Sequence, residues 1–262
     1  MASPSHPDIS PDLIAFAEKL ADTARGIARG YFRSGVAIDD KADESPVTIA
    51  DRNAEEAMRA LIMERYPDHG IVGEEFGSHK PGSDWSWVLD PIDGTGAFII
   101  GMPLFGVLIS LAFEGRPVLG VIDAPALDER WVGAVGQPTA FNGNPCSTGA
   151  ITSLADATMH TTAPEMFAGD DAQRLDQLRA ATKRLRYGGD CYQYGLLALG
   201  GVDLVIESGM KTHDFMALAP VVEGAGGVFS DWAGAPVTIE SGGKVLAAAN
   251  RDLHEQVLPL LQ

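Results

Sequence analysis

Two stretches near the N-terminus carry apolar residues at the three- and four-residue spacing of an amphipathic helix. The first follows Ser10, which can cap a helix, and has Pro11 in its first turn. Its apolar positions are Leu13, Phe16, Ala17, Leu20, Ala21, Ala24, Ile27, Ala28 and Tyr31. The second stretch follows Thr48 and ends before Pro67. Its apolar face consists of Ala54, Ala57, Met58, Leu61 and Ile62. The pattern predicts two helices separated by a polar loop at residues 39–46.

Short apolar runs in the next segment indicate β-strands. Residues 71–73 and 87–89 form two such runs, and each ends directly in acidic residues. Residues 105–113 and 117–122 form longer runs, joined by a short connection with a central glycine. Two apolar runs joined in this way are typical of a hairpin, so we expect the last two strands to pair.

Strand and helix patterns alternate in the second half of the chain. Turn signals lie at residues 141–144 and at the glycine pair 188–189. The expected helices are 172–183, 192–199 and 215–223, and the expected strands are 202–206 and short segments near 228 and 245–248. Such alternation predicts an α/β layer with a largely buried sheet. A boundary near residues 149–152 divides the chain into two expected subdomains that pack closely together, residues 1–150 and 151–262.

Composition limits the classes of partner. The 262 residues are 45% hydrophobic and 21% charged, which is typical of a globular chain with a sizeable core. The formal net charge of −17 repels nucleic acid and anionic membranes, so neither is expected as a partner. The same charge disfavours a phosphate ester unless bound cations reverse its sign locally.

Cysteine usage and the N-terminal residues indicate a cytoplasmic protein. Cys146 and Cys191 are the two cysteines, and they lie far apart without the spacing of a disulfide framework or a zinc site. The N-terminal residues lack a basic start followed by an apolar run, so no secretory signal is expected. No apolar stretch approaches the roughly 18 residues that a membrane span requires.

Carboxylates gather where apolar strands end or helices begin. They occur in Ile49-Ala50-Asp51, Gly73-Glu74-Glu75, the segment from Asp90 to Thr95, and Thr212-His213-Asp214. Acids beside buried strands carry a large desolvation cost unless a cation pairs with them. The chain has 19 Lys and Arg in total, and none lies within the first three of these segments. Divalent cations are the expected partners, and all-oxygen ligands favour magnesium or manganese over zinc.

The segment from Asp90 to Thr95 is the most informative of these. Pro91 stiffens the turn, so that Asp90 and Asp93 can converge on one point and the Ile92 carbonyl can add a further ligand. The glycine at position 94 allows a close approach of the backbone to a ligand. The amides of residues 94 and 95 could hold phosphate at a helix start, with the Thr95 hydroxyl placed to orient a water.

Each acid by itself also has an ordinary structural interpretation. Asp51 alone is better explained as a carboxylate at the start of a helix, and Glu75 as a cap or a solvated turn residue. The combination of residues 73–75 with residues 90–95 favours a functional site over a set of unrelated caps.

These motifs resemble those of the inositol monophosphatase family of magnesium-dependent, lithium-sensitive phosphatases. The resemblance rests on GEE at 73–75, DPIDGT at 90–95 and the pair Glu207 and Asp214, and it spans roughly residues 13–250. It implies the layered α/β/α/β sandwich shared with fructose-1,6-bisphosphatase, and a homodimer. The site would lie between the two halves of the sandwich and hold two or three Mg²⁺ ions, with Mn²⁺ as a substitute.

The resemblance also implies roles for particular residues. The implied metal ligands are Glu74, Asp90, the Ile92 carbonyl, Asp93 and Asp214. Asp51 and Thr95, with Glu74, would orient or deprotonate the attacking water. Glu207 would face the part of the substrate that is not phosphate.

Within the family, residues 189–194 and 202–207 resemble the bacterial histidinol-phosphate phosphatases more than the inositol phosphatases. Histidinol phosphate carries an ammonium group, whereas inositol is uncharged, so the extra carboxylate of Asp190 would improve charge complementarity. An equally weighted alternative is that Asp190 caps the helix expected to follow it. The implied substrate-binding residues are Asp93, Gly94, Thr95, Gly189, Asp190, Cys191, Glu207 and Asp214.

Three further positions either depart from the family pattern or have a role that the resemblance does not define. Gly96 lacks the side chain that relatives often carry near the phosphate entrance, which leaves substrate preference less defined. His213 is interpreted as a neighbour of Asp214 and not as a ligand. Lys41 could help to neutralise phosphate, but a solvated surface lysine is the simpler interpretation.

The expected reaction is direct hydrolysis of a phosphate monoester without a phosphoenzyme, and histidinol phosphate is the favoured substrate in histidine biosynthesis. Inositol monophosphate or another polyol or sugar phosphate is the main alternative. A nucleotide 3′-phosphatase is less favoured, because nothing indicates a pocket for base stacking. A catalytically silent metal-binding homologue is the alternative from a different functional class.

Overall fold

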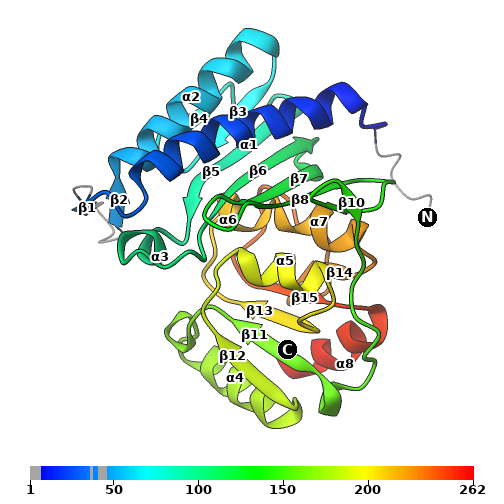
Figure 1. The fold of residues 1–262 in the computed structure, drawn as a ribbon. Helices are drawn as coiled ribbons and strands as arrows, with labels where there is room; N and C mark the ends of the chain where they lie inside the picture. The colour runs from blue at the N-terminus through cyan, green and yellow to red at the C-terminus, as the bar shows by residue number, and fades with distance from the viewer. Residues whose placement is uncertain (1–6, 36–37, 41–45) are drawn as a thin grey trace.

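The computed structural model describes residues 7–35, 38–40 and 46–262 (Figure 1). The predicted loop residue Lys41 lies outside these ranges. Both predicted N-terminal helices are present, α1 at Pro11–Tyr31 and α2 at Ile49–Arg65. The amide of Leu13 donates to the Ser10 hydroxyl at 3.4 Å, which confirms the expected cap of α1. A short hairpin of β1, Ile38–Asp40, and β2, Pro46–Thr48, lies between the two helices in sequence.

The helices α1 and α2 lie side by side against one face of an eight-stranded sheet (Figure 1). The order of its strands is β10-β9-β8-β7-β6-β5-β3-β4. Their bounds are β3 Gly70–Gly73, β4 Gly77–His79, β5 Trp85–Asp93, β6 Gly106–Phe113, β7 Arg116–Ala124, β8 Glu129–Ala134, β9 Ala140–Phe141 and β10 Asn144–Pro145. Only β3 and β5 pair in parallel, and β6 with β7 forms the predicted antiparallel hairpin. A buried apolar cluster that includes Phe16, Met58 and Trp87 joins the helices to this sheet.

A five-stranded sheet forms most of the second half of the chain, with the order β12-β11-β13-β15-β14. The strand bounds are β11 Thr158–Thr161, β12 Arg184–Tyr187, β13 Leu204–Glu207, β14 Val228–Asp231 and β15 Val245–Ala248. Between the two sheets lie α5 Tyr192–Ala198, α6 Thr212–Phe215 and α7 Leu218–Gly224 (Figure 1). The helices α4 Asp170–Ala181 and α8 Arg251–Leu261 cover the outer face. The remaining helical segments are α3 Thr95–Ile99 and two 3₁₀ turns at Leu154–Asp156 and Pro164–Met166.

The predicted α/β sandwich is therefore confirmed, and α4 with α8 adds an outer layer to it. The division into subdomains at residue 150 stays a prediction. Among the described residues, no helix combines the length and apolar character that a membrane span requires.

The single helix expected at residues 215–223 is divided into α6 and α7. Pro220 has no amide hydrogen, so it cannot donate to the Met216 carbonyl one turn earlier. The hydroxyl of Ser110 on β6 donates to that carbonyl instead, at 3.2 Å. The break thus exchanges a helical hydrogen bond for one that ties the middle helices to the large sheet. The pattern analysis also missed α8, although Asn250 caps it with an ordinary side-chain bond to the Leu253 amide.

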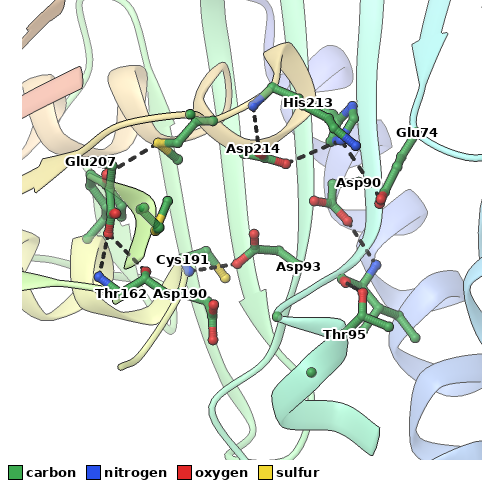
Figure 2. A pocket seen from close by; sticks show the side chains of 18 of the residues that line it. Glu74, Asp90, Asp93, Thr95, Thr162, Asp190, Cys191, Glu207, His213 and Asp214 are labelled. Atoms are coloured by element: carbon green, nitrogen blue, oxygen red, sulfur yellow. Dashed lines mark hydrogen bonds and ion pairs between the residues drawn. The ribbon is translucent and has the colours of Figure 1, made fainter. Parts of the chain in front are cut away.

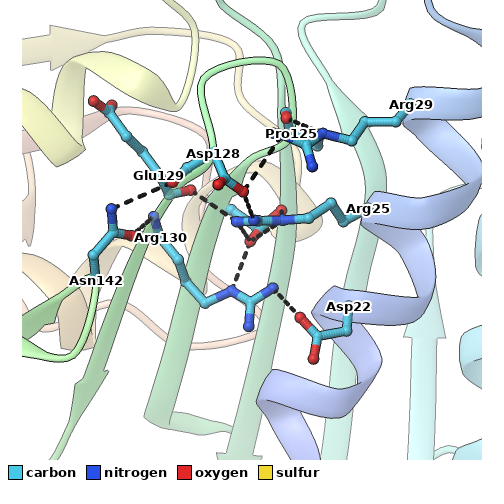
Figure 3. A network of polar contacts seen from close by, with 9 residues as sticks. Asp22, Arg25, Arg29, Pro125, Asp128, Glu129, Arg130 and Asn142 are labelled. Carbon is cyan, nitrogen blue, oxygen red and sulfur yellow. Dashed lines mark hydrogen bonds and ion pairs between the residues drawn. The ribbon is translucent and has the colours of Figure 1, made fainter.

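A buried ionic network fastens α1 to the far strands of the large sheet (Figure 3). The carboxylate of Asp123 on β7 is fully buried, and it accepts hydrogen bonds from Arg25 on α1 and from Nε of Arg130 on β8, the latter at 2.6 Å. Arg130 also contacts Asp22, and Arg25 contacts Asp128. One buried acid thus holds two guanidinium groups from different layers of the fold.

Removal of that acid should destabilise the protein strongly. Asp123→Ala would leave two mostly buried guanidinium groups without their shared partner, so we expect the free energy of unfolding to fall by about 3–5 kcal/mol. Asp22→Ala removes an ion-pair partner that is 68% exposed, so it should cost less than about 1 kcal/mol. Urea unfolding monitored by tryptophan fluorescence measures both values, and equal effects of the two variants would contradict this role of Asp123.

Candidate active site

One cavity of about 370 Å³ lies where the large sheet meets α5, α6 and the start of α3. It collects side chains that are distant in the sequence (Figure 2). The predicted site residues that line it are Glu74, Asp90, Ile92, Asp93, Gly94, Thr95, Asp190, Cys191, Glu207 and Asp214. Asp51 and Gly189, also predicted, do not line it. The further lining residues Thr162, Gln193 and His213 were not predicted as part of the site.

A bulge in β5 directs Asp90 and Asp93 to the same place. Residues three apart in a regular strand point to opposite faces of the sheet. Here Asp90 pairs with Leu108 and Asp93 with Gly106, so β5 contains one extra residue over this interval. Pro91 fits this position because it has no amide to donate to the ladder.

Short-range bonds hold the turn after the bulge. The amide of Ile92 donates to Asp90 Oδ1 at 3.1 Å, and the Thr95 hydroxyl donates to the Ile92 carbonyl at 3.1 Å. Gly94 has a φ of 79°, in the left-handed region that favours glycine. A Cβ at Gly94 would also lie 2.9 Å from Asp190 Oδ2, so the close approach of these two segments requires glycine.

Glu55, which the sequence analysis missed, supports Glu74 from behind. The Glu55 side chain is fully buried in α2, and its carboxylate accepts the amides of Glu75 at 2.7 Å and Phe76 at 3.2 Å. Arg59 donates to the same carboxylate at 2.7 Å. A Cβ at Gly73 would lie 1.9 Å from Glu55 Oε1, which explains the glycine before Glu74. The sequence signal that could have identified Glu55 is its position one helical turn after Asp51, on the buried face of the same helix.

Asp214 and His213 approach the site from α6. The Lys211 amide donates to Asp214 Oδ2 at 2.7 Å. His213 Nε2 lies 3.3 Å from Asp214 Oδ1 and 3.9 Å from Glu74 Oε1. His213 is therefore a neighbour of Asp214, as predicted, but it also reaches the Glu74 carboxylate, which follows β3 of the large sheet (Figure 2).

The loop before α5 brings Asp190 beside Asp93. The amide of Cys191 donates to Asp93 Oδ2 at 2.7 Å. The expected helix cap at Asp190 is not observed, because Cys191 occupies the N-cap position and Asp190 adopts a left-handed φ of 44° before it. This conformation is uncommon for a residue other than glycine, and it directs the Asp190 carboxylate toward Gly94 and the cavity.

Glu207 ends β13 at the opposite side of the cavity and is 1% exposed. Its carboxylate accepts the Thr162 amide at 2.8 Å, the Thr162 hydroxyl at 2.9 Å and the Thr161 hydroxyl at 3.2 Å. Gln193 Nε2 donates to the same carboxylate, while His160 Nδ1 lies 2.8 Å from Gln193 Oε1. Neutral donors thus hold the Glu207 oxygens at fixed positions facing the cavity.

Burial and mutual repulsion perturb the cavity carboxylates. Burial, followed by the charges of Glu74, Asp93 and Asp214, raises the pKa of Asp90 well above its usual range. The pKa of Asp93 is raised in the same way by burial and then by Asp190 and Asp214. Carboxyl oxygens that repel one another in this way become compatible only through protonation or through bound cations.

The donor set fits divalent metal ions. Among the described residues, two groups of side chains have ligand atoms within 4.8 Å of one another, namely Glu74, Asp90 and His213, and Asp90, Asp93 and Asp214. The Asp51 carboxylate is a further feature that a bound cation would satisfy. Its Oδ2 completes the cap of α2 by accepting from the Thr48 amide at 2.9 Å, whereas its buried Oδ1 has no hydrogen-bond partner among the described residues. Asp51 is therefore a helix-start carboxylate, as expected, and its role toward the attacking water stays a prediction.

Gly96 leaves open space at the cavity mouth. Apart from Gly96 and its two chain neighbours, no atom of the described residues lies within 4 Å of the position that a Cβ would occupy there.

Comparisons with known proteins agree with this geometry. The sequence profile of the inositol monophosphatase family matches residues 11–262, so the chain belongs to that metal-dependent phosphatase family. The chain is 46% identical over 257 residues to the chloroplastic bifunctional phosphatase IMPL2 of Arabidopsis thaliana, covering 95% of this chain and 74% of the plant protein. It is 39% identical to a histidinol-phosphatase of Chlorobaculum parvum, covering 95% and 96% of the two chains.

A solved structure of an inositol monophosphatase from Zymomonas mobilis superposes with a TM-score of 0.90 at 47% identity. The match covers 97% of this chain and 99% of that one. The predicted family and fold are thereby confirmed, and the chain is a phosphatase of phosphate monoesters.

The pKa of Glu207 leads to a prediction on stability. Burial raises this pKa to about 7 from the ordinary 4.5, despite the hydrogen bonds from Thr162, Gln193 and Thr161 that lower it. Folding therefore favours the protonated acid, which stabilises the protein fully below about pH 4.5 and no longer above about pH 7. In the metal-free protein, this acid should remove up to about 3 kcal/mol of unfolding free energy as the pH rises through that window.

Glu207→Gln should eliminate this part of the pH dependence, because the glutamine side chain does not titrate. Its carbonyl can keep the Thr162 bonds while its amide donates to the Thr161 hydroxyl, so the local structure should be retained. Urea unfolding of chelator-treated protein between pH 4 and 8 measures the difference between variant and parent. Glu165→Gln, at an exposed position, is the matched control. A difference that does not change with pH would contradict the perturbed pKa of Glu207.

Proposed function

We propose that this protein is a magnesium-dependent phosphatase that hydrolyses L-histidinol phosphate to histidinol and inorganic phosphate. The observation that carries the proposal is the position of Asp190. Its carboxylate lies beside Gly94 and Asp93, at the edge of the metal-ligand cluster, and so gives the cavity one acid more than metal binding requires. An acid in that place suits a substrate with a cationic group.

The proposed metal ligands are Glu74, Asp90, the Ile92 carbonyl, Asp93 and Asp214. The Ile92 carbonyl accepts one hydrogen bond from Thr95, which leaves a second lone pair for a ligand. When bound, magnesium supplies positive charge that balances the phosphate and lowers the pKa of a water.

The chain itself positions the water and the ester. The free Oδ1 of Asp51 is suited to accept a proton from the attacking water, because burial, the largest cause, raises the pKa of Asp51. The Thr95 hydroxyl orients that water from the start of α3. The water oxygen forms a new bond to phosphorus as the bond from phosphorus to the ester oxygen breaks, and the departing oxygen takes up a proton to give the alcohol.

Opposite walls of the cavity would contact different parts of the substrate. Phosphate would lie near Gly94 and Thr95, and the organic part would extend toward Glu207 and Thr162. Burial, then the Asp214 charge, raises the pKa of Asp190 to about 6. A neighbouring ammonium group would lower this pKa again, because its positive charge favours the ionised carboxylate. The likeness to a histidinol-phosphatase of Chlorobaculum parvum supports this substrate.

Hydrolysis of inositol monophosphate or another polyol phosphate is the second candidate. The similarity to the Zymomonas mobilis inositol monophosphatase favours it, as do the Thr162 hydroxyl and the Glu207 carboxylate, which suit the hydroxyl groups of a polyol. A catalytically silent homologue is disfavoured because the predicted metal acids converge on one cavity. The homodimer and the cytoplasmic location remain part of the proposal, and light scattering of the purified protein tests the former.

Asp93→Asn should abolish phosphatase activity without loss of the fold. The variant amide can still accept the Cys191 hydrogen bond through its carbonyl oxygen, but it removes one negative charge from the metal ligands. We expect kcat to fall at least about 10³-fold in magnesium, with an unchanged circular dichroism spectrum. Turnover close to that of the parent protein, or activity that persists in EDTA, would refute the assigned site; Asp22→Asn on the surface is the control.

Asp190→Asn should separate the two candidate substrates. We expect kcat/KM for histidinol phosphate to fall about 10- to 100-fold, because the charge pair between Asp190 and the ammonium group is lost, while kcat/KM for inositol monophosphate changes by less than about threefold. Phosphate release from both substrates at equal magnesium gives the comparison. An equal loss for both substrates would show that Asp190 supports the metal centre and does not recognise an ammonium group.

A further inference from the structure

His213 differs from the other groups around the acidic cluster because it offers nitrogen. Its side chain is 11% exposed, and its Nε2 faces Glu74 Oε1 at 3.9 Å and Asp214 Oδ1 at 3.3 Å (Figure 2). Glu74 lies in the turn directly after β3, whereas Asp214 belongs to α6. His213 therefore lies between ligand groups that the fold brings together, and not at the rim of the cavity.

The spacing of these groups is close to that of atoms that share one ion. One ligand atom each from Glu74, Asp90 and His213 lies within 4.8 Å of the others. Ligands at metal bonds of about 2.0–2.3 Å lie at most about 4.5 Å apart. A small side-chain rotation would bring the ligand atoms from within 4.8 Å to within about 4.5 Å of one another.

A second observation also points to a ligand in this region. Asp51 is 1% exposed, and its Oδ1 has no hydrogen-bond partner among the described residues, while the charge of Glu74 raises its pKa after the larger effect of burial. A buried acceptor without a donor, close to Glu74, is the feature that a bound cation or its water would satisfy.

We propose that His213 Nε2 is a metal ligand on the Glu74 and Asp90 side of the cluster, which makes this centre a mixed nitrogen and oxygen site. This inference rests on the proposed metal centre and adds a ligand to it. Imidazole binds first-row transition-metal ions, Mn²⁺ included, better than it binds the harder Mg²⁺. The mixed site should therefore prefer Mn²⁺ over Mg²⁺ more strongly than a site of oxygen ligands alone.

Pulsed electron paramagnetic resonance of the Mn²⁺-loaded protein tests the bond directly. The parent protein should show ¹⁴N modulation of the Mn²⁺ echo, and this modulation should change to the ¹⁵N frequency when histidine is supplied with ¹⁵N in its ring. His213→Phe should lose the modulation, whereas His79→Phe on β4 should keep it. The labelled parent protein answers the question even where a variant folds poorly.

Calorimetric titration with Mn²⁺ and with Mg²⁺ gives a second readout that does not depend on turnover. His213→Phe should weaken Mn²⁺ binding at least about tenfold and Mg²⁺ binding by less than about threefold. Mn²⁺ binding without nitrogen modulation in the parent protein, or with modulation that persists in His213→Phe, would overturn the role of His213 and leave the carboxylate centre intact. A parent protein that binds neither ion would overturn the proposed function as well.

Discussion

The repulsion among buried carboxylates is the constraint on which this structure depends. Asp90 is 2% exposed, and the charges of Glu74, Asp93 and Asp214 all act on it. Such a cluster is unfavourable by itself, since each charge loses hydration and meets others of the same sign. The fold maintains it through bonds that are made elsewhere, and the cluster is thereby prepared for cations before any substrate arrives. The arrangement that makes the cluster unfavourable by itself is also the one that suits the cations of this metal-dependent family.

The supports of the cluster come from local backbone features and from long-range packing together. The bulge in β5 sets the directions of Asp90 and Asp93, and Glu55 anchors the amides that follow Glu74. The Cys191 amide holds Asp93 from the opposite side of the cavity. Because these supports belong to α2, β5 and the loop before α5, the centre is complete only when the layers are assembled.

The two sheets contribute different chemistry to one cavity. Segments of the large sheet supply Glu74, Asp90, Asp93 and the turn at Gly94, the middle layer supplies Asp190, Gln193 and Asp214, and β13 supplies Glu207. Residues from both halves of the chain therefore line a single cavity. The relatives of this chain include a histidinol-phosphatase and an inositol monophosphatase.

The sequence alone determined the features that depend on neighbouring residues. The caps of α1 and α2, the β6–β7 hairpin and the turn from Asp90 to Thr95 follow from local spacing and from proline and glycine chemistry. Tertiary structure decided the rest, because contacts between distant segments leave no periodic signal. Only the assembled layers place Glu55 behind Glu74, turn Asp190 away from a cap and bring His213 of α6 to the Glu74 carboxylate beside the large sheet.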